Sequence, residues 1–188
     1  MDYATLSMAE VVAGLESVAR DTQETFGAHT AQQLNWRPDA TRWSVAQCFD
    51  HLLTTNRQVF QAAESALTGA TPPTLWQRLP MLPAVMGRML VRSQAPETTR
   101  RFTTVPKAQP SNSDIAADVI PLFIEQNRDA IARVRSLDAG AARAIMASPF
   151  FSFITYSVED GWRLVFAHDR RHFEQARRVT LSAGFPSR

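Results

Sequence analysis

The 188-residue chain contains one cysteine, one lysine and only seven glycines. Because a lone cysteine, Cys48, cannot form an intramolecular disulfide, we expect a reducing environment. No apolar run approaches the roughly 18 residues that span a bilayer, and residues 1–4 lack the basic and apolar regions of a signal peptide. These absences lead us to expect a cytoplasmic protein without a membrane partner.

The charge balance and the composition exclude further classes of protein. Lysine and arginine together number 20 and the acidic residues number 18, which gives a formal net charge of +2. Because the sequence has no strong basic patch and no recognition motif, it predicts no nucleic-acid partner. A hydrophobic fraction of 45% is typical of a globular protein, and we expect residues 1–188 to form a single domain.

Helical periodicity dominates the apolar pattern, and strand-like alternation is rare. The periodicity predicts four long helices, over residues 5–26, 44–68, 113–137 and 157–182. Ser44 and Gln47 have the spacing of a capping box, and Ser157 is the expected cap of the last helix. Gly69 suits the end of the second helix, and Pro121 either kinks the third helix or marks its first turn.

The connection between the second and third helices is long, covering residues 70–111. It holds seven of the eleven prolines, which exclude one continuous helix, although residues 82–91 could form a short one. Shorter links join the other helices, and residues 146–156 are expected to form an apolar loop. We expect the short links to give antiparallel pairs and the crossover to leave the second and third helices parallel. This arrangement predicts an all-α four-helix bundle with one long central crossover.

Three histidines lie on the inward faces of the predicted helices. His168 and His172 are four residues apart and therefore share one helix face, while His51 lies on the apolar face of the second helix. Neutral imidazole is the commonest metal ligand, and three protein ligands with an open position are typical of catalytic zinc. Buried core histidines without metal are the alternative. Asp169 stands where a zincin motif requires glutamate, so zincin chemistry is not predicted.

Three segments of the sequence resemble the DinB/YfiT-like superfamily of metalloenzymes. Residues 34–38 and 43–52 include the tryptophan-serine helix start followed by His51 and leucine, and residues 168–176 carry the paired histidines followed by Gln175. The resemblance covers nearly the whole chain and implies an up-down-down-up bundle. It also implies a divalent metal held by His51, His168 and His172, for which we expect Zn²⁺ or Ni²⁺, with Mn²⁺ or Fe²⁺ as alternatives.

The resemblance also implies a reaction class, because the family includes S-transferases and isomerases that use low-molecular-weight thiols. We expect a metal-dependent enzyme acting on a small-molecule substrate, with thiol transfer ahead of metal-assisted hydrolysis. A metal-bound water or a substrate thiol would be the nucleophile. The alternative is a non-catalytic bundle that binds metal or a small ligand. In either case a homodimer is the expected assembly.

Residues one helical turn from the predicted ligands have two interpretations each. Cys48 could be a fourth ligand, although a small buried core residue is favoured. Thr55 and Gln175 could orient a ligand or contact substrate, or could simply bond between helices. The arginines near the paired histidines form either a solvated face or an anion site for an acidic substrate; they are Arg170, Arg171, Arg177 and Arg178.

The remaining aromatic and methionine side chains carry weaker predictions. Trp36, Trp43 and Trp162 are expected as core anchors rather than substrate platforms. His29 is expected to be exposed in a loop or at a helix end. A second group could line a mouth over the metal, or could fill the core or a dimer contact; it consists of Met81, Met86, Met89, Phe150, Phe151 and Phe153.

Overall fold

Four long helices make up the body of the protein, whose computed structural model describes residues 1–72, 74–98 and 104–187. They are α1 (Met8–Phe26), α3 (Val45–Thr68), α5 (Val119–Arg135) and α7 (Val158–Thr180). Their apolar faces meet in one core whose centre includes Leu15, Phe49, Phe123 and Val165. The predicted all-α four-helix bundle is thus confirmed. Among the described residues, no helix is long and apolar enough to cross a membrane.

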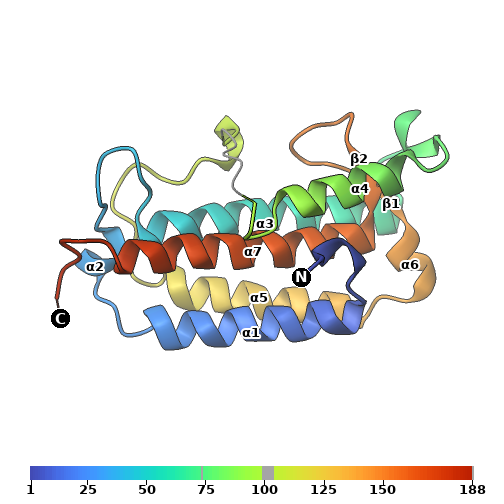
Figure 1. Ribbon diagram of the computed structural model, residues 1–188. Coiled ribbons are helices and arrows are strands. Elements are labelled where there is room, and N and C mark those ends of the chain that lie inside the picture. Colours follow the sequence, from blue (N-terminus) through green and yellow to red (C-terminus); the bar gives the residue numbers. More distant parts are fainter. Residues whose placement is uncertain (73, 99–103, 188) are drawn as a thin grey trace.

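The long helices run in an up-down-down-up order. In Figure 1, α1 and α7 point in one direction, and α3 and α5 point in the other. Helix α1 packs against α5 and α7, and α3 packs against the same two helices. Helices joined by the shorter links are therefore antiparallel, as predicted, but they lie diagonally across the bundle. The α3–α7 seam joins the two helices that carry the three histidines.

The helix boundaries follow local capping chemistry where a cap is present. Ser44 and Gln47 form the predicted capping box, and Gly69 ends α3 with a left-handed φ of 68°. The first helix begins three residues later than predicted, because Ser7 forms its own capping box with Glu10. The residues before it form the 3₁₀ turn η1 (Tyr3–Thr5).

The third long helix begins at Val119 rather than near residue 113. Pro121 lies in its first turn, where the backbone N–H that proline lacks would have no acceptor within the helix. The preceding residues are held outside the helix by Asn35, the last residue of α2 (Ala31–Asn35). The Asn35 Nδ2 atom donates to the Ile115 oxygen at 2.8 Å, and the Ile115 nitrogen donates to Asn35 Oδ1 at 2.9 Å.

A small hairpin precedes the last helix, where an apolar loop was predicted. Strand β1 (Ile145–Ala147) pairs antiparallel with β2 (Thr155–Ser157), and Met146 lies opposite Tyr156. The strands are three residues long and largely buried, so they show too little alternation to be recognised as strands. The short helix α6 (Ala139–Arg143) connects α5 to this hairpin.

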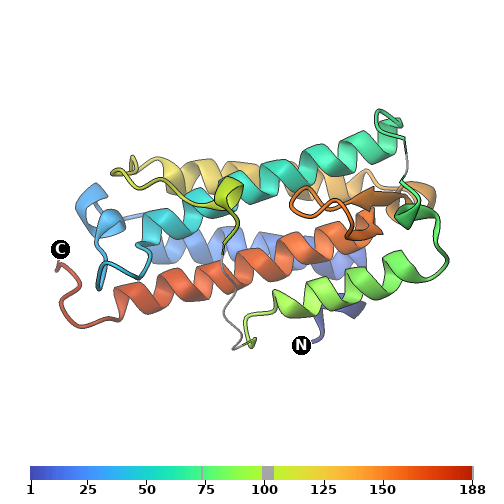
Figure 2. The ribbon, with the colours of Figure 1, turned by 90° about the horizontal axis from the view of Figure 1, so that it is seen from above.

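The crossover wraps the bundle on the side of α7 and α3. After the turn η2 (Trp76–Arg78), helix α4 (Leu82–Ser93) lies beside α7 and β2, as Figure 2 shows. The contact is close at Gly87, where an added Cβ would lie 2.5 Å from Asp160 Oδ2. The crossover includes residues 73 and 99–103, which lie outside the described residues. The short helix predicted over residues 82–91 is confirmed as α4.

The returning part of the crossover is hydrogen-bonded along α3. It contains the turn η3 (Pro106–Ala108). The Gln58 side chain donates to the Lys107 oxygen at 3.2 Å, and Gln47 donates to the Ser111 oxygen at 3.0 Å. The Ser111 nitrogen in turn donates to Asp50 Oδ2 at 2.8 Å. These bonds fix residues 107–111 against the helix that carries His51.

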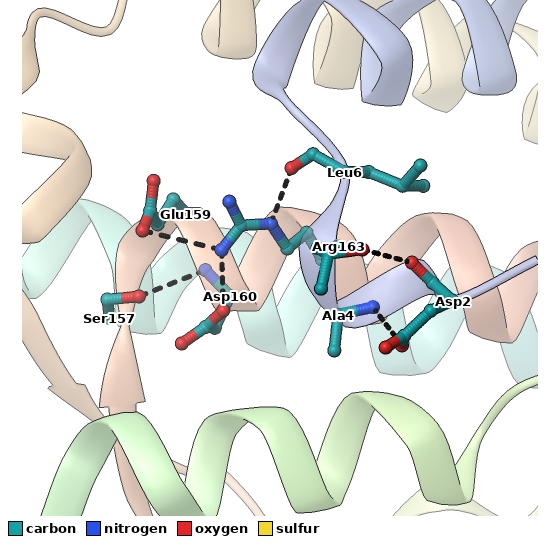
Figure 3. A network of polar contacts seen from close by, with 8 residues as sticks. Asp2, Ala4, Leu6, Ser157, Glu159, Asp160 and Arg163 are labelled. Atoms are coloured by element: carbon teal, nitrogen blue, oxygen red, sulfur yellow. Dashed lines mark hydrogen bonds and ion pairs between the residues drawn. The ribbon is translucent and has the colours of Figure 1, made fainter.

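A polar network fastens the N-terminal segment to the start of α7 (Figure 3). Arg163 Nε donates to the Leu6 oxygen at 2.7 Å, and its Nη1 donates to Asp160 Oδ1 at 2.8 Å. Glu159 lies 3.3 Å from the same guanidinium group. Because the Arg163 and Asp160 side chains are only 14% and 7% exposed, this pair is shielded from solvent more than the ion pairs on the outer surface.

Candidate metal centre

The three predicted ligands converge between α3 and α7. One ring nitrogen from each of His51, His168 and His172 lies within 4.8 Å of the others. The Nε2 atoms of His51 and His168 are 3.3 Å apart, and the ring centroids of His168 and His172 are separated by 4.6 Å. Because residues i and i+4 share a helix face, α7 presents its pair together to the one histidine of α3.

The orientation of His51 is fixed by the crossover. Its Nδ1 atom lies 2.5 Å from the backbone oxygen of Ala108 in η3. A carbonyl oxygen can only accept, so this nitrogen carries the proton, and the Nε2 lone pair of the neutral ring points toward His168. A backbone carbonyl behind the far ring nitrogen is the usual support for a metal-binding histidine.

Burial keeps the three rings unprotonated at neutral pH. It lowers the pKa of His51 below its ordinary value. For His168 and His172, burial together with the charges of neighbouring histidines and Arg171 lowers the pKa well below the ordinary value. Within the described residues, the buried Nδ1 atom of His172 has no hydrogen-bond partner.

These observations fit a divalent metal ion. Metal ions bind the neutral form of imidazole, and the cluster offers three such rings with one tautomer already set by Ala108. Nitrogen ligands of this kind suit several divalent ions, including Zn²⁺ and Ni²⁺. An electron-pair acceptor at the centre would also offset the cost of three buried imidazoles facing one another.

The residues predicted beside the ligands have three different environments. Cys48 is fully buried in the apolar core, and burial raises the pKa of its thiol to about 12. Among the described residues, it is not part of the converging ligand group. The Thr55 hydroxyl donates to the His51 oxygen at 2.9 Å and so bonds within its own helix. A hydrogen bond to the Gln175 side chain, which favours the protonated ring of His172, raises the pKa of His172 and opposes the effect of burial.

Trp43 packs against the core and also borders the histidine cluster. Its ring is stacked near His172, with a centroid distance of 5.8 Å and an interplanar angle of 22°. It also contacts His51 at a centroid distance of 5.0 Å. Trp36 and Trp43 are partly buried and pack against the core, and Trp162 is buried beside Phe60. The sequence could have indicated the contact of Trp43 with His51, because Trp43 precedes His51 by about two helical turns.

A buried amide–carboxylate group lies directly behind the histidine pair. Asn56 on α3 donates to Asp169 Oδ1 at 2.9 Å, and Asn127 on α5 lies 3.4 Å from Asp169 Oδ2. Burial raises the pKa of Asp169 to about 7, against the opposing effect of these two hydrogen bonds. The group holds three helices together next to His168. Sequence reasoning missed this role of Asp169.

A groove of about 1520 Å³ opens over the histidines. Its walls come from α3, α7, the end of α4, the η3 segment and the loop of the β-hairpin. Met89, Phe150 and Phe151 line it, in agreement with the predicted mouth. The same prediction also placed Met81, Met86 and Phe153 at this mouth, but they are not among the described residues that line the groove. Met81 is 79% exposed.

Two further predictions concern the arginines of α7 and His29. Arg171 and Arg178 line the groove, while Arg170 and Arg177 make ion pairs outside it with Asp21 and Glu174. The predicted exposure of His29 was wrong. Its ring is partly buried between two aromatic side chains, at 5.9 Å from Phe26 and 5.7 Å from Phe185.

Comparison with known proteins identifies the family. A family model described as the DinB superfamily matches residues 14–176. The chain belongs to the DinB superfamily. This confirms the resemblance seen in the sequence, since the match includes His51, His168 and His172. Among curated proteins, none matches the chain at a significant level.

One solved structure has a similar fold. It is YfiT from Bacillus subtilis, described as a probable metal-dependent hydrolase with an unusual four-helix bundle topology. The TM-score is 0.64 with 15% sequence identity, over 97% of this chain and 92% of the other. At this identity the likeness establishes the bundle topology of this DinB-superfamily protein.

Proposed function

We propose that this DinB-superfamily protein is a metal-dependent enzyme that attacks a small-molecule electrophile. His51, His168 and His172 would hold one divalent ion, Zn²⁺ or Ni²⁺ before Mn²⁺ or Fe²⁺. The observation that carries the proposal is the convergence of three unprotonated imidazoles, one fixed by Ala108, beside a large groove. Such an ion, when bound, supplies Lewis acidity and a nucleophile at neutral pH.

The chain's own residues provide the surroundings for this chemistry. Ala108 holds the His51 ring in one tautomer, and Asn56 with Asp169 fixes the rotation of α7 beside His168. Trp43 packs on two of the rings and lines the groove beside them. These contacts keep the ligand nitrogens in place before substrate enters, which is what preorganised catalysis requires.

Hydrolysis is the reaction best supported by comparison, because the structural neighbour YfiT carries that description. A second candidate is thiol transfer to an electrophile. It is favoured by the groove volume of about 1520 Å³, since a pocket for one small ligand is usually about 300–1,000 Å³. A groove of this size can hold a thiol and its acceptor together. Binding of metal or a small ligand without turnover remains the alternative outcome of the test.

Metal content is the first test. The protein is purified without a nickel column or chelator, and its divalent metals are measured beside those of His168→Ala and His29→Ala. We expect about one ion per chain in the wild type and in His29→Ala, which retains the cluster, and none in His168→Ala. Equal metal in all three proteins, or no uptake of Zn²⁺, Ni²⁺, Mn²⁺ or Fe²⁺ by the folded wild type, would overturn the proposal.

Turnover separates the candidate reactions once the metal is established. The metal-loaded protein is tested with model esters and amides alone, and with electrophiles in the presence of small thiols. Product formed without thiol supports hydrolysis, and product that requires thiol supports transfer. Both activities should disappear with chelator and in His168→Ala. Metal binding without turnover on either substrate set would support the non-catalytic alternative.

A further inference from the structure

Exposed apolar side chains are concentrated in one segment of the crossover. Twelve large apolar side chains of the described residues are exposed, and half of them lie within residues 75–89. Single exposed apolar residues are ordinary on a protein surface, whereas a cluster of them marks a surface that meets a partner. We call this cluster the α4 face; it consists of Leu75, Trp76, Leu79, Met81, Val85 and Met89.

Helix α4 buries one side against the bundle and leaves the other side to solvent. Its buried residues are spaced four apart and are Pro83, Gly87 and Val91. Val85 and Met89 are also four apart but lie on the opposite side of the helix, where they are 58% and 63% exposed. Figure 2 shows this helix on the outside of the bundle, beside α7. Since neither Val85 nor Met89 packs against the core, the stability of the fold does not explain their apolar character.

The charge of the α4 face has one sign. Residues 65–96 contain three arginines and no aspartate or glutamate. Arg92 pairs with Asp2 at 2.7 Å. Arg78 and Arg88 are exposed, and neither forms an ion pair within the described residues. The face therefore combines apolar side chains with two cations whose charge is not neutralised.

A second copy of the chain fits this face poorly. A two-fold contact places the same surface on both sides of the interface, so Arg78 and Arg88 of both copies would be enclosed in it. The face brings no acidic residue of its own, and the acidic residues at the adjoining start of α7 are paired with Arg163. Enclosing cations without a partner is strongly unfavourable, so the partner has to supply negative charge.

The shape of the face favours a broad surface over a peptide. Peptides are usually recognised in a groove or at a free sheet edge. Of the six residues of the α4 face, only Met89 lines the groove over the histidines. The other five line neither this groove nor the second pocket, beside α2. They lie on the outer side of a turn and a helix, which a planar surface can cover.

We propose that the α4 face binds the surface of an anionic phospholipid bilayer. Its apolar side chains enter the boundary between headgroups and acyl chains, while Arg78 and Arg88 contact lipid phosphate groups. Tryptophan, leucine and arginine together are typical of helical segments that lie in this boundary. Such a segment needs no membrane-spanning run, whose absence was the reason to expect no membrane partner. The proposal is independent of the metal centre and adds a binding partner to it.

Flotation with vesicles tests the proposal on the full-length protein. Vesicles of phosphatidylcholine and phosphatidylglycerol in equal amounts are compared with vesicles of phosphatidylcholine alone. We expect binding to the anionic vesicles to be at least about tenfold stronger, because each arginine near an anionic surface contributes to attraction, and we expect added salt to weaken it. Trp76 is the one exposed tryptophan of the four. Bound vesicles should therefore shield the fluorescence of the protein from iodide.

Two matched pairs of variants assign the binding to the α4 face. Val85→Glu and Leu122→Glu each place a carboxylate at an exposed apolar position of a helix, on α4 and on α5. Val85→Glu should weaken binding to the anionic vesicles at least about tenfold, since an apolar side chain is withdrawn from the lipid, and Leu122→Glu should change it little. Arg88→Gln should weaken binding about fivefold, whereas Arg57→Gln, at an exposed position of α3, should not. Circular dichroism verifies that the variants are folded.

The outcomes separate a lipid surface from the other partners. Binding that Val85→Glu and Arg88→Gln weaken and the two controls keep supports the proposal. No binding of the folded wild type to anionic vesicles overturns it. Equal weakening in Val85→Glu and Leu122→Glu also overturns it, because the net charge of the protein then governs the binding. Sedimentation velocity without vesicles tests self-association. A dimer that Val85→Glu dissociates, with no vesicle binding, would show that a second copy covers the face.

Discussion

The two sides of the bundle have opposite characters. Where α1 faces α5, the buried side chains are apolar apart from Thr22 and Asn127. Where α3 faces α7, the buried set includes His51, Asn56 and Asp169. Both sides belong to the same hydrophobic core, so the polar residues of the second side are not a consequence of exposure.

The difference indicates that the α1–α5 side mainly stabilises the fold, whereas the α3–α7 side carries the candidate site. An apolar interface stabilises the fold by removing surface from water, whereas each buried polar group lowers stability unless it is hydrogen-bonded. On the α3–α7 side, Asn56 bonds to Asp169 and His51 bonds to Ala108. The Nδ1 atom of His172 has no hydrogen-bond partner among the described residues, and we propose that the metal binds where the three rings converge.

The largest effect on stability is expected from the apolar side. Leu15 on α1 is fully buried, so Leu15→Ala should lower the free energy of unfolding by about 2–5 kcal/mol. Leu122→Ala on α5, which is 51% exposed, is the control and should have little effect. Chemical denaturation gives both values. The folded Leu15→Ala protein should still take up metal, and a loss of metal from its folded state would contradict the division between the two sides.

The sequence predicts that the three histidines face inward, because each one's direction depends on helix geometry. A spacing of four residues places His168 and His172 on one face of α7, and the apolar neighbours of His51 turn it inward. The helix ends at Ser44 and Gly69 are predictable for a similar reason, since capping involves residues within one turn. The directions of these side chains and the helix ends need no knowledge of how the helices pack, whereas the convergence of the histidines requires α3 to pack against α7.

The residues that the sequence does not predict depend on distant contacts. The carbonyl that orients His51 belongs to Ala108, and any residue type could supply that oxygen. The late start of α5 follows from Asn35, which bonds to Ile115 eighty residues away. The strands around Met146 are too short to show a period of their own. In each case the decisive partner is brought close only by the folded crossover or hairpin.

A smaller effect is expected where a polar contact of the α3–α7 side is broken. Asn56→Ala removes the 2.9 Å bond to Asp169 and leaves a buried carboxyl group with less support. We expect a loss of about 1–3 kcal/mol in the free energy of unfolding and weaker metal affinity, because the rotation of α7 beside His168 is no longer fixed. Gln58→Ala is the matched control on the same helix, since its bond to Lys107 is exposed. If the metal affinity of Asn56→Ala equals that of the control, Asp169 has only a structural role.

The smallest effect should come from the exposed edge of the groove, where polar contacts remain in water. Asp39 accepts hydrogen bonds from the Thr41 hydroxyl, the Arg42 side chain and the Thr41 backbone nitrogen. These bonds lower the pKa of Asp39 to about 2, from an ordinary value of about 3.9. A carboxyl group with a lowered pKa stabilises the fold above its unfolded pKa, and this contribution is lost as the pH falls toward the folded pKa. The stability difference between the wild type and Asp39→Asn should therefore shrink between about pH 4 and pH 2, as thermal unfolding at several pH values can measure. Because Asp39 is exposed, the difference should be well below that of Asn56→Ala. A pH-independent difference would show that these contacts do not hold the charged form of Asp39.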